Sequence, residues 1–191
     1  MASTYLIDPI IFLIDTLFSL YVLAVLLRFL LQWSGADFYN PISQFLVKAT
    51  HPPLRLLRRF VPSIGKIDTS SLVLMLVLQM VSDFSILLLK SVSISIGALV
   101  ILSFTQLVTL LINVFVFAVF ARAILSWVNP GTFNAAAAIL ATLTEPLLDL
   151  CRKIVPDMGG MDLSPLAALL FLQLVKMVLL PPLHELASLL A

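Results

Sequence analysis

A stretch of 23 residues occurs twice in this chain, with the two copies 94 positions apart. Residues 50–72 read THPPLRLLRRFVPSIGKIDTSSL, and residues 144–166 read TEPLLDLCRKIVPDMGGMDLSPL. Matching leucines carry little information in so apolar a chain, but prolines, arginines, glycines and aspartates match as well. Identities of these types at one fixed offset indicate a tandem duplication.

The same offset continues on both sides of this stretch, so the duplication covers most of the chain. We therefore divide the chain into a first module, residues 1–95, and a second module, residues 96–191. The matched pairs are Arg28/Arg122, Trp33/Trp127, Asn40/Asn134, Thr50/Thr144, Pro52/Pro146, Arg58/Arg152, Arg59/Lys153, Pro62/Pro156, Gly65/Gly159, Asp68/Asp162, Ser70/Ser164 and Gln79/Gln173.

The composition is typical of a membrane protein. Hydrophobic residues make up 61% of the 191 residues, charged residues make up only 11%, and the mean hydropathy is +1.15. Four apolar segments are long enough to cross a hydrocarbon core about 30 Å thick. They lie at residues 10–33, 72–90, 98–121 and 165–183. The sequence therefore predicts an all-α membrane protein with four transmembrane helices, two in each module.

Between the two spans of the first module, residues 52–62 have the pattern of a short amphipathic helix. The three arginines fall on one side of this helix, and the leucines and the phenylalanine fall on the other. Proline suits the first turn of a helix and a second proline closes it, so Pro52 and Pro62 mark its ends. A basic amphipathic helix beside membrane spans is expected to lie among the lipid headgroups. The apolar pattern of residues 41–49 predicts a second interfacial segment, directly before this amphipathic helix.

Each module carries an Asp-x-Ser element directly before its second span, at residues 68–70 and 162–164. An Asp or Ser oxygen there can accept the free backbone N–H groups of a starting helix. Helix capping is the favoured role of these elements. An additional role would be an ion pair between each aspartate and the arginine ten residues before it, which would anchor the amphipathic helix.

Lysine and arginine are concentrated between the two spans of each module. The first of these segments holds five basic residues and the second holds Arg152 and Lys153, whereas the N-terminus and the tail after Leu183 hold none. The positive-inside rule therefore places both segments in the cytoplasm and both termini outside it. Two spans per module give both modules the same orientation, which predicts a parallel repeat with a pseudo-twofold axis along the membrane normal.

The order of these motifs resembles the YggT family of small integral membrane proteins. The resemblance rests on three features in order: R…W…N, a proline-bounded amphipathic segment, and the motif P-x-x-G-x-x-D-x-S-P. This last motif is complete at residues 156–165. The first module departs from it by having Ser71 in place of the final proline. It implies two tandem family modules in a bacterial inner membrane, with single-module YlmG-type relatives. Proposed family roles are cell division and nucleoid organisation, osmotic-stress tolerance, and assembly of membrane cytochrome or photosynthetic complexes.

Residue patterns typical of enzymes are missing from the sequence. His51 and His184 lie in different modules and, by the predicted topology, on opposite sides of the membrane. There is no phosphate-binding glycine loop, no G-x-S-x-G motif and no histidine–carboxylate spacing suited to a metal. We therefore predict a protein that is not an enzyme and binds no metal or cofactor. The basic segment predicts contact with anionic lipids, at about 1 kcal/mol per residue, rather than with nucleic acid.

Charged residues interrupt the predicted spans. Arg28, near the end of the first span, is expected to extend to the headgroups. Asp15, Asp83 and Lys176 lie at a similar depth, about two-thirds of the way across at 1.5 Å per helical residue. Intramembrane charges are costly and face partners or water. We expect Asp83 to pair with Lys176, with Asp15 as the rival partner; snorkelling and an ion or proton site are the alternatives.

These features favour a non-enzymatic membrane scaffold or assembly protein, whose cytoplasmic amphipathic helices bind an unidentified membrane or division protein. The first alternative is a small transporter or ion-coupled osmotic-stress protein that uses the layer of Asp15, Asp83 and Lys176. A cofactor-assembly factor for membrane cytochromes is a weaker alternative. A homo-oligomer is compatible with each of these functions.

Overall fold

The computed structural model describes residues 2–65, 67–128, 134–154 and 162–190. These residues form six helices, which confirms the predicted all-α class for this part of the chain. The helices are α1 (Ala2–Ser34), α2 (Pro41–Leu57), α3 (Thr69–Leu89), α4 (Ile96–Val128), α5 (Ala135–Ile154) and α6 (Ser164–Leu189).

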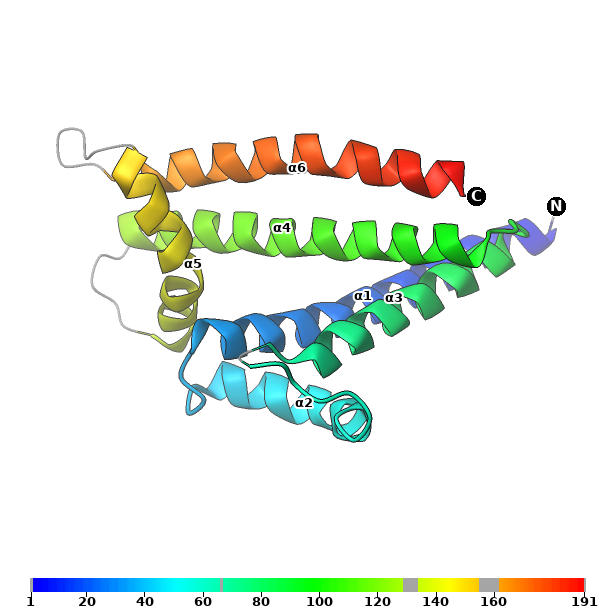
Figure 1. The fold of residues 1–191 in the computed structure, drawn as a ribbon, viewed down its shortest axis with the longest axis horizontal. Coiled ribbons are helices and arrows are strands. Elements are labelled where there is room, and N and C mark those ends of the chain that lie inside the picture. The colour runs from blue at the N-terminus through cyan, green and yellow to red at the C-terminus, as the bar shows by residue number, and fades with distance from the viewer. Residues whose placement is uncertain (1, 66, 129–133, 155–161, 191) are drawn as a thin grey trace.

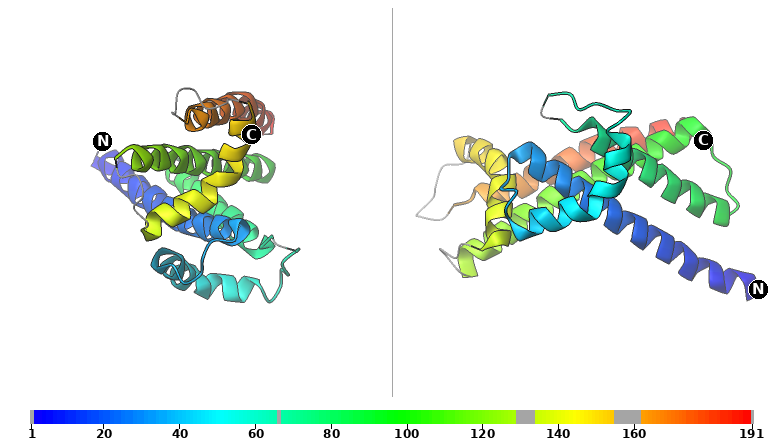
Figure 2. Two further views of the ribbon diagram at one scale, coloured as in Figure 1. Left: turned by 90° about the vertical axis from the view of Figure 1, so that its left-hand side faces the viewer. Right: turned by 90° about the horizontal axis from the view of Figure 1, so that it is seen from below.

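Both modules have the same order of elements: a long helix, a connecting helix and a second long helix. α1 and α4 run in one direction and α3 and α6 run in the other, so the two modules are parallel (Figures 1 and 2). α1 packs on α3 and α4 packs on α6, and the modules meet where α3 packs on α4. The connecting helices α2 and α5 lie at the end of the bundle where α1 and α4 finish (Figure 1).

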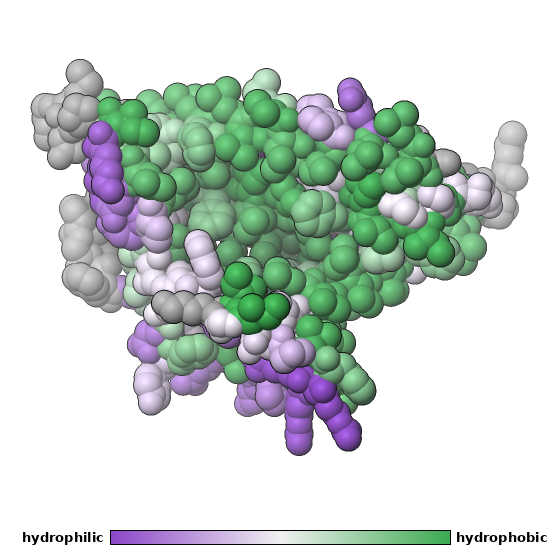
Figure 3. Space-filling view, in the orientation of Figure 1, coloured by the Kyte–Doolittle hydropathy of each residue, from purple (hydrophilic) through white to green (hydrophobic). Residues whose placement is uncertain are grey.

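Four helices are long and apolar enough to cross a membrane. The candidate spans are Leu6–Ser34, Thr69–Leu89, Ile96–Ser126 and Ser164–Leu189. They fall on α1, α3, α4 and α6, where the sequence predicted them. Hydrophobic side chains cover the outer surface of these helices along most of their length (Figure 3). The four spans indicate a multi-pass membrane protein.

The predicted end of the fourth span at Pro181 and Pro182 is wrong, because α6 continues to Leu189. A proline inside a helix removes one backbone hydrogen bond, and membrane spans tolerate this where neighbouring groups support the helix. The hydroxyl of Ser95, just before α4, donates to the carbonyl of Leu190, at the end of α6. This contact joins the end of α6 to the start of α4.

The division into two interfacial segments, at residues 41–49 and 52–62, is also wrong. The structure has one helix, α2, from Pro41 to Leu57, followed by a turn at residues 58–60. The helix therefore begins eleven residues before the predicted proline boundary. It also ends before Pro62.

Two consecutive prolines, Pro52 and Pro53, lie inside α2 without ending it. Pro53 has no N–H to offer the carbonyl of Ala49, four residues earlier. The hydroxyl of Tyr21 in α1 donates to that carbonyl at 3.3 Å. A side chain from the neighbouring span thus replaces one of the two missing backbone donors, which helps the helix to continue through the prolines.

The predicted pseudo-twofold arrangement is wrong as well. A twofold axis that brings α3 against α4 would also bring their counterparts, α6 and α1, against each other. Instead α6 packs on α4 and α5, while α1 packs on α2, α3 and α5, and α4 lies between them (Figures 1 and 2). Each module keeps its internal fold, but the modules dock through two non-equivalent surfaces.

Candidate functional site

Each module ties its connecting helix to its first span through one arginine. In the first module, Arg28 donates from Nη1 to the Thr50 hydroxyl at 2.9 Å and to the carbonyl three residues before it at 3.3 Å. In the second module, Arg122 makes the same bonds, to the Thr144 hydroxyl at 2.9 Å and to the carbonyl three residues before it at 3.3 Å. The repeated sequence is therefore also a repeated set of contacts.

The expected extension of Arg28 to the headgroups does not occur, because its residue is only 7% exposed and it bonds to α2. The partner hydroxyls of both arginines donate in turn to carbonyls of their own helix, at 2.7 Å in each module. One hydroxyl can donate and accept at once, so Thr50 and Thr144 satisfy both partners while fully buried. Sequence reasoning assigned these threonines no role; their match at the 94-residue offset was the available signal.

A second pair of arginines joins the end of each connecting segment to the start of the next span. Arg58 forms an ion pair with Asp68, and Arg152 forms one with Asp162 at 3.4 Å. The anchoring contact considered from the sequence is therefore present in both modules. Each aspartate also accepts a backbone N–H at the start of the following helix, at 3.4 Å in the first module and 2.8 Å in the second.

The surroundings of these aspartates keep them ionised. Burial alone would raise the pKa of Asp68, but hydrogen bonds from Arg58 and Ser71 outweigh it and hold the pKa below its ordinary value. Burial likewise opposes ionisation of Asp162, and bonds from Ser164 help to hold the pKa of that carboxyl below its ordinary value. Both carboxylates therefore act as charged acceptors for the arginines.

Other repeated residues shape the ends of the connecting segments. Asn40 accepts the N–H two residues later at 2.9 Å, and Asn134 accepts the N–H three residues later at 2.7 Å, so each asparagine caps its helix. The Ser70 hydroxyl donates to the Val61 carbonyl at 2.6 Å, and Gly65 turns the chain with a φ of +61°. These groups set where each connecting helix begins and where the chain returns to the membrane.

The remaining repeated residues are placed as follows. Trp33 is half exposed at the end of α1, Ser164 is buried at the start of α6, and Pro146 lies inside α5. The side chain of Trp127, with Pro156 and Gly159, lies outside the described residues.

The two modules differ at the residue that follows the buried threonine. In the second module this is Glu145, which accepts from Arg152 at 2.8 Å and from Arg122. The bond from Arg152 is the largest effect that lowers the pKa of Glu145, and it also raises the pKa of Arg152. In the first module the same position is His51, an exposed side chain. Sequence reasoning assigned no role to Glu145, although the mismatch at the repeat offset marked it.

The predicted pair between Asp83 and Lys176 is wrong. Asp83 accepts from the Ser103 hydroxyl of α4 at 2.7 Å and from Gln79 of its own helix at 3.2 Å. Gln79 also donates to Gln106 of α4. These four polar side chains lie at the contact of α3 with α4, so they join the two modules rather than line a charged layer.

Lys176 instead donates to Asn113 of α4 at 3.0 Å. Asp83 bonds to α4 at Ser103, and Lys176 bonds to α4 at Asn113, so the two charges bond at different heights along α4. The partner residues are ten positions apart in α4, about 15 Å along the helix at 1.5 Å per residue. Asp15 is exposed on α1. The geometry separates Lys176 from Asp83 in the layer that the sequence suggested.

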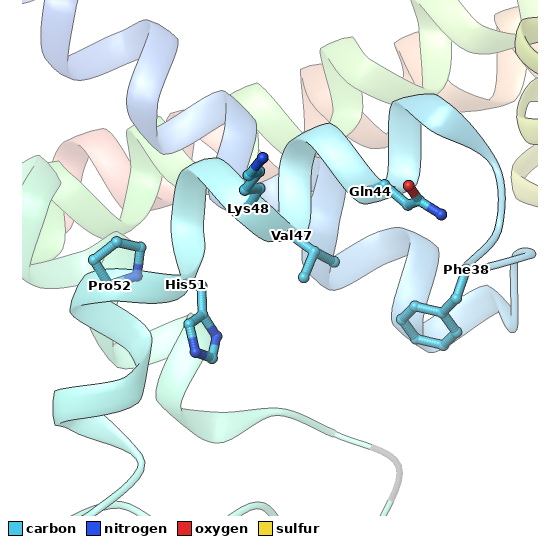
Figure 4. A pocket seen from close by; sticks show the side chains of 6 residues that line it. All are labelled: Phe38, Gln44, Val47, Lys48, His51 and Pro52. Carbon is cyan, nitrogen blue, oxygen red and sulfur yellow. The ribbon is translucent and has the colours of Figure 1, made fainter.

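Several clefts open on the described surface. An apolar cleft of about 310 Å³ lies between α1, α3 and α4. An open cleft of about 600 Å³ runs along α2, and Figure 4 shows its lining side chains on successive turns of that helix and on the loop before it. Its lining residues are Phe38, Gln44, Val47, Lys48, His51 and Pro52. Among the described residues, no three His, Cys, Asp or Glu side chains gather as a metal site.

Tandem modules, four apolar spans and a repeated pair of arginine ties define an α-helical, multi-pass membrane protein built by duplication. The CCB3/YggT family model matches the chain twice, at residues 7–89 and 101–183. The two matches are 94 residues apart at both ends, which is the offset of the sequence repeat. The chain belongs to the CCB3/YggT family, as its motifs predicted.

Relatives of the chain come from bacteria and from a plant. An uncharacterized protein of Pseudomonas aeruginosa is 45% identical over 172 residues, which cover 89% of this chain and 87% of the relative. The protein YggT of Escherichia coli K12 is 39% identical over 171 residues, 87% of this chain and 86% of the relative. The chloroplastic YlmG homolog protein 2 of Arabidopsis thaliana is 36% identical over 61 residues, 32% of this chain and 24% of the relative. No solved structure matches the chain.

Proposed function

We propose that this protein is a non-enzymatic scaffold of the bacterial inner membrane. Its connecting helices, α2 and α5, lie among the lipid headgroups on the cytoplasmic side and bind membrane proteins that assemble or divide there. The observation that carries this proposal is the repeated attachment of both helices to the bundle. Arginine ties in the middle of each connecting helix and at the end of each connecting segment fix it in place while leaving its outer surface free.

The surface of the connecting helices supports a position among headgroups. α2 buries one face, with Ser43, Leu46, Thr50 and Leu54, against the bundle. The opposite face combines basic residues with exposed apolar residues such as Phe45 and Leu56. A helix with this mixture is stabilised where acyl chains meet headgroups. Hydrophilic side chains gather over α2 and the turn after it, and over α5, at the edges of the apolar surface (Figure 3).

The geometry gives less support to a transporter. Ion-coupled transport through this protein would need polar groups that continue across the bilayer. Asp83 is instead enclosed by side chains of α3 and α4, and Lys176 bonds to Asn113, about 15 Å further along α4 than Ser103. These contacts fit structural roles between helices, so the scaffold is the better-supported function.

Photo-crosslinking in living cells tests the scaffold proposal. A photoreactive amino acid is placed at Leu56 in α2, which is 70% exposed, or at Leu150 in α5, which is 59% exposed. Leu17 in α1, which is 62% exposed, is the control position. We expect discrete protein adducts from the two connecting helices and mainly lipid adducts from the control. Equal adduct patterns at all three positions would contradict a docking surface on α2 and α5.

A further inference from the structure

The charge around the arginine ties differs between the modules. The repeat offset pairs His51 with Glu145 and Arg55 with Asp149. The first module has three arginines and one aspartate in this set, which gives a net charge of +2 with His51 neutral. The second module has two arginines and three carboxylates, which gives −1. The sets are Arg28, Arg55, Arg58 and Asp68 in the first module, and Arg122, Arg152, Glu145, Asp149 and Asp162 in the second.

Only in the second module does a carboxylate contact both arginines, the one in the first span and the one at the end of the connecting segment. There Glu145 bridges Arg122 and Arg152, so both guanidinium groups face an anion. In the first module, no carboxylate among the described residues lies within 4.0 Å of Arg28, which is 7% exposed. Its bonds to described residues both come from Nη1, although a guanidinium has five N–H donors. A buried cation of this kind is stabilised by an anion that takes its remaining donors.

We propose that the first module binds a phosphate group at the position that the Glu145 carboxylate occupies in the second module. Arg28 and Arg58 hold its oxygens, because their counterparts hold Glu145. Guanidinium forks suit phosphate oxygens, with which they form paired charge-assisted hydrogen bonds. The ligand is either the phosphate of an anionic phospholipid headgroup or a soluble phosphate.

Two clefts border this site. Lys48 and His51 line the cleft along α2 (Figure 4), which shares Phe38 and Val47 with a small cavity that Arg28 borders. A second cleft, of about 400 Å³, is lined by Arg58 and shares Gln32 with the same small cavity. His51 therefore stands where an approaching anion meets the arginines. The inference is independent of the proposed scaffold function, because it depends only on the comparison of the two modules.

Two reciprocal substitutions test the proposal. His51→Glu supplies the first module with the missing carboxylate, and Glu145→His removes it from the second; His51→Gln is a neutral control at the same exposed position. The full chain is purified in each form, and its helix content and elution volume confirm that it is folded. Native mass spectrometry then counts the retained phosphatidylglycerol against phosphatidylcholine, and a parallel series adds inorganic phosphate.

The wild type and His51→Gln are expected to retain about one phosphatidylglycerol per chain. His51→Glu should bind at least about tenfold more weakly, and Glu145→His should retain a second molecule. Loss of phosphatidylglycerol on adding millimolar inorganic phosphate would identify soluble phosphate as the ligand, and retention would identify the headgroup. The proposal is overturned if His51→Glu and His51→Gln retain equal amounts, or if Glu145→His retains no more than the wild type.

Discussion

Arg28 and Arg122 stand out from the sequence because they repeat, but the repeat alone does not show what they bind. An arginine near the end of a span is expected to reach the headgroups, and both arginines instead donate to a buried hydroxyl of a connecting helix. The hydroxyls that accept these bonds belong to Thr50 and Thr144. Threonine is common in apolar helices, so the sequence pattern does not mark these two residues as polar contacts. The contact could not be predicted until α2 and α5 were placed against α1 and α4.

Replacing Thr144 by valine should destabilise the protein by about 1–2 kcal/mol. The substitution keeps the shape of the side chain but removes the acceptor for a charged donor, a bond of about 1.5–3 kcal/mol. Unfolding in mixed micelles, monitored by circular dichroism, measures the effect. Thr142→Val is the matched control, because this exposed threonine on α5 bonds only to its own helix. Equal losses in both variants would show that the arginine tie contributes nothing.

Stability should fall at acidic pH partly through Glu145. The folded-state pKa of this carboxyl lies below its ordinary value of about 4.5, so its stabilising effect is fully present above that value. The effect is lost as the pH falls through the folded-state pKa, because the protonated form gives up its ion pairs. The unfolding temperature of the wild type should therefore drop more between about pH 7 and pH 4 than that of Glu145→Gln. Parallel pH profiles would refute this assignment.

The ends of the helices follow local rules more closely than their interiors do. The Asp-x-Ser element predicts the start of α3, where Asp68 is the N-cap and accepts the Ser71 N–H. At α6 the N-cap is Leu163, without a side-chain cap, and Asp162 accepts the Ser164 N–H from one residue further out. Continuity through proline is harder to predict. Pro53 would weaken an isolated helix, and a donor from another span, the Tyr21 hydroxyl, compensates for it. Sequence patterns within α2 carry no information about that donor.

The end of α1 offers a test of one such local rule. Gly35 has a φ of +71° and lies in a Schellman motif, in which the Ala36 N–H donates to the Leu31 carbonyl at 2.9 Å. Gly35→Ala should destabilise the protein by about 1–2 kcal/mol, because a side chain is disfavoured in this left-handed conformation. Gly97→Ala, inside α4 with room for a methyl group, should instead be neutral or stabilising. A stabilising effect at Gly35 in the same unfolding assay would contradict the motif.

On the scale of the whole molecule, the repeat determines the fold of each module but not how the modules meet. The α3–α4 contact buries Asp83 with Ser103 and two glutamines. The repeat offset pairs Asp83 with Met177, so α6 lacks the acid that this contact uses. The two modules share a fold but present different side chains where they could meet. The repeat alone therefore predicts a twofold arrangement that the structure does not have. The number of spans, their parallel order and the family could be predicted, because they depend on composition and motifs within one module.

A double-mutant cycle tests this inter-module contact. Ser103→Ala should cost about 0.6 kcal/mol and at most about 1.7 kcal/mol, the range measured for hydrogen bonds between membrane helices. In combination with Asp83→Ala the losses should be non-additive, because the two side chains share one bond and alanine, unlike asparagine, has no oxygen to accept it. The cycle of Asp83→Asn with Lys176→Met should be additive. Coupling in the second cycle but not the first would restore the charge pair that the sequence suggested.

We propose that α2 and α5 lie together at the cytoplasmic surface, with both chain termini on the other side. Fusions of a fluorescent protein that matures only in the cytoplasm test it directly, after Ser63, after Lys153 and at the C-terminus. The concentration of basic residues in the two connecting segments predicts fluorescence from the first two fusions and none from the third. Fluorescence at the C-terminus, with both connecting segments dark, would contradict the account.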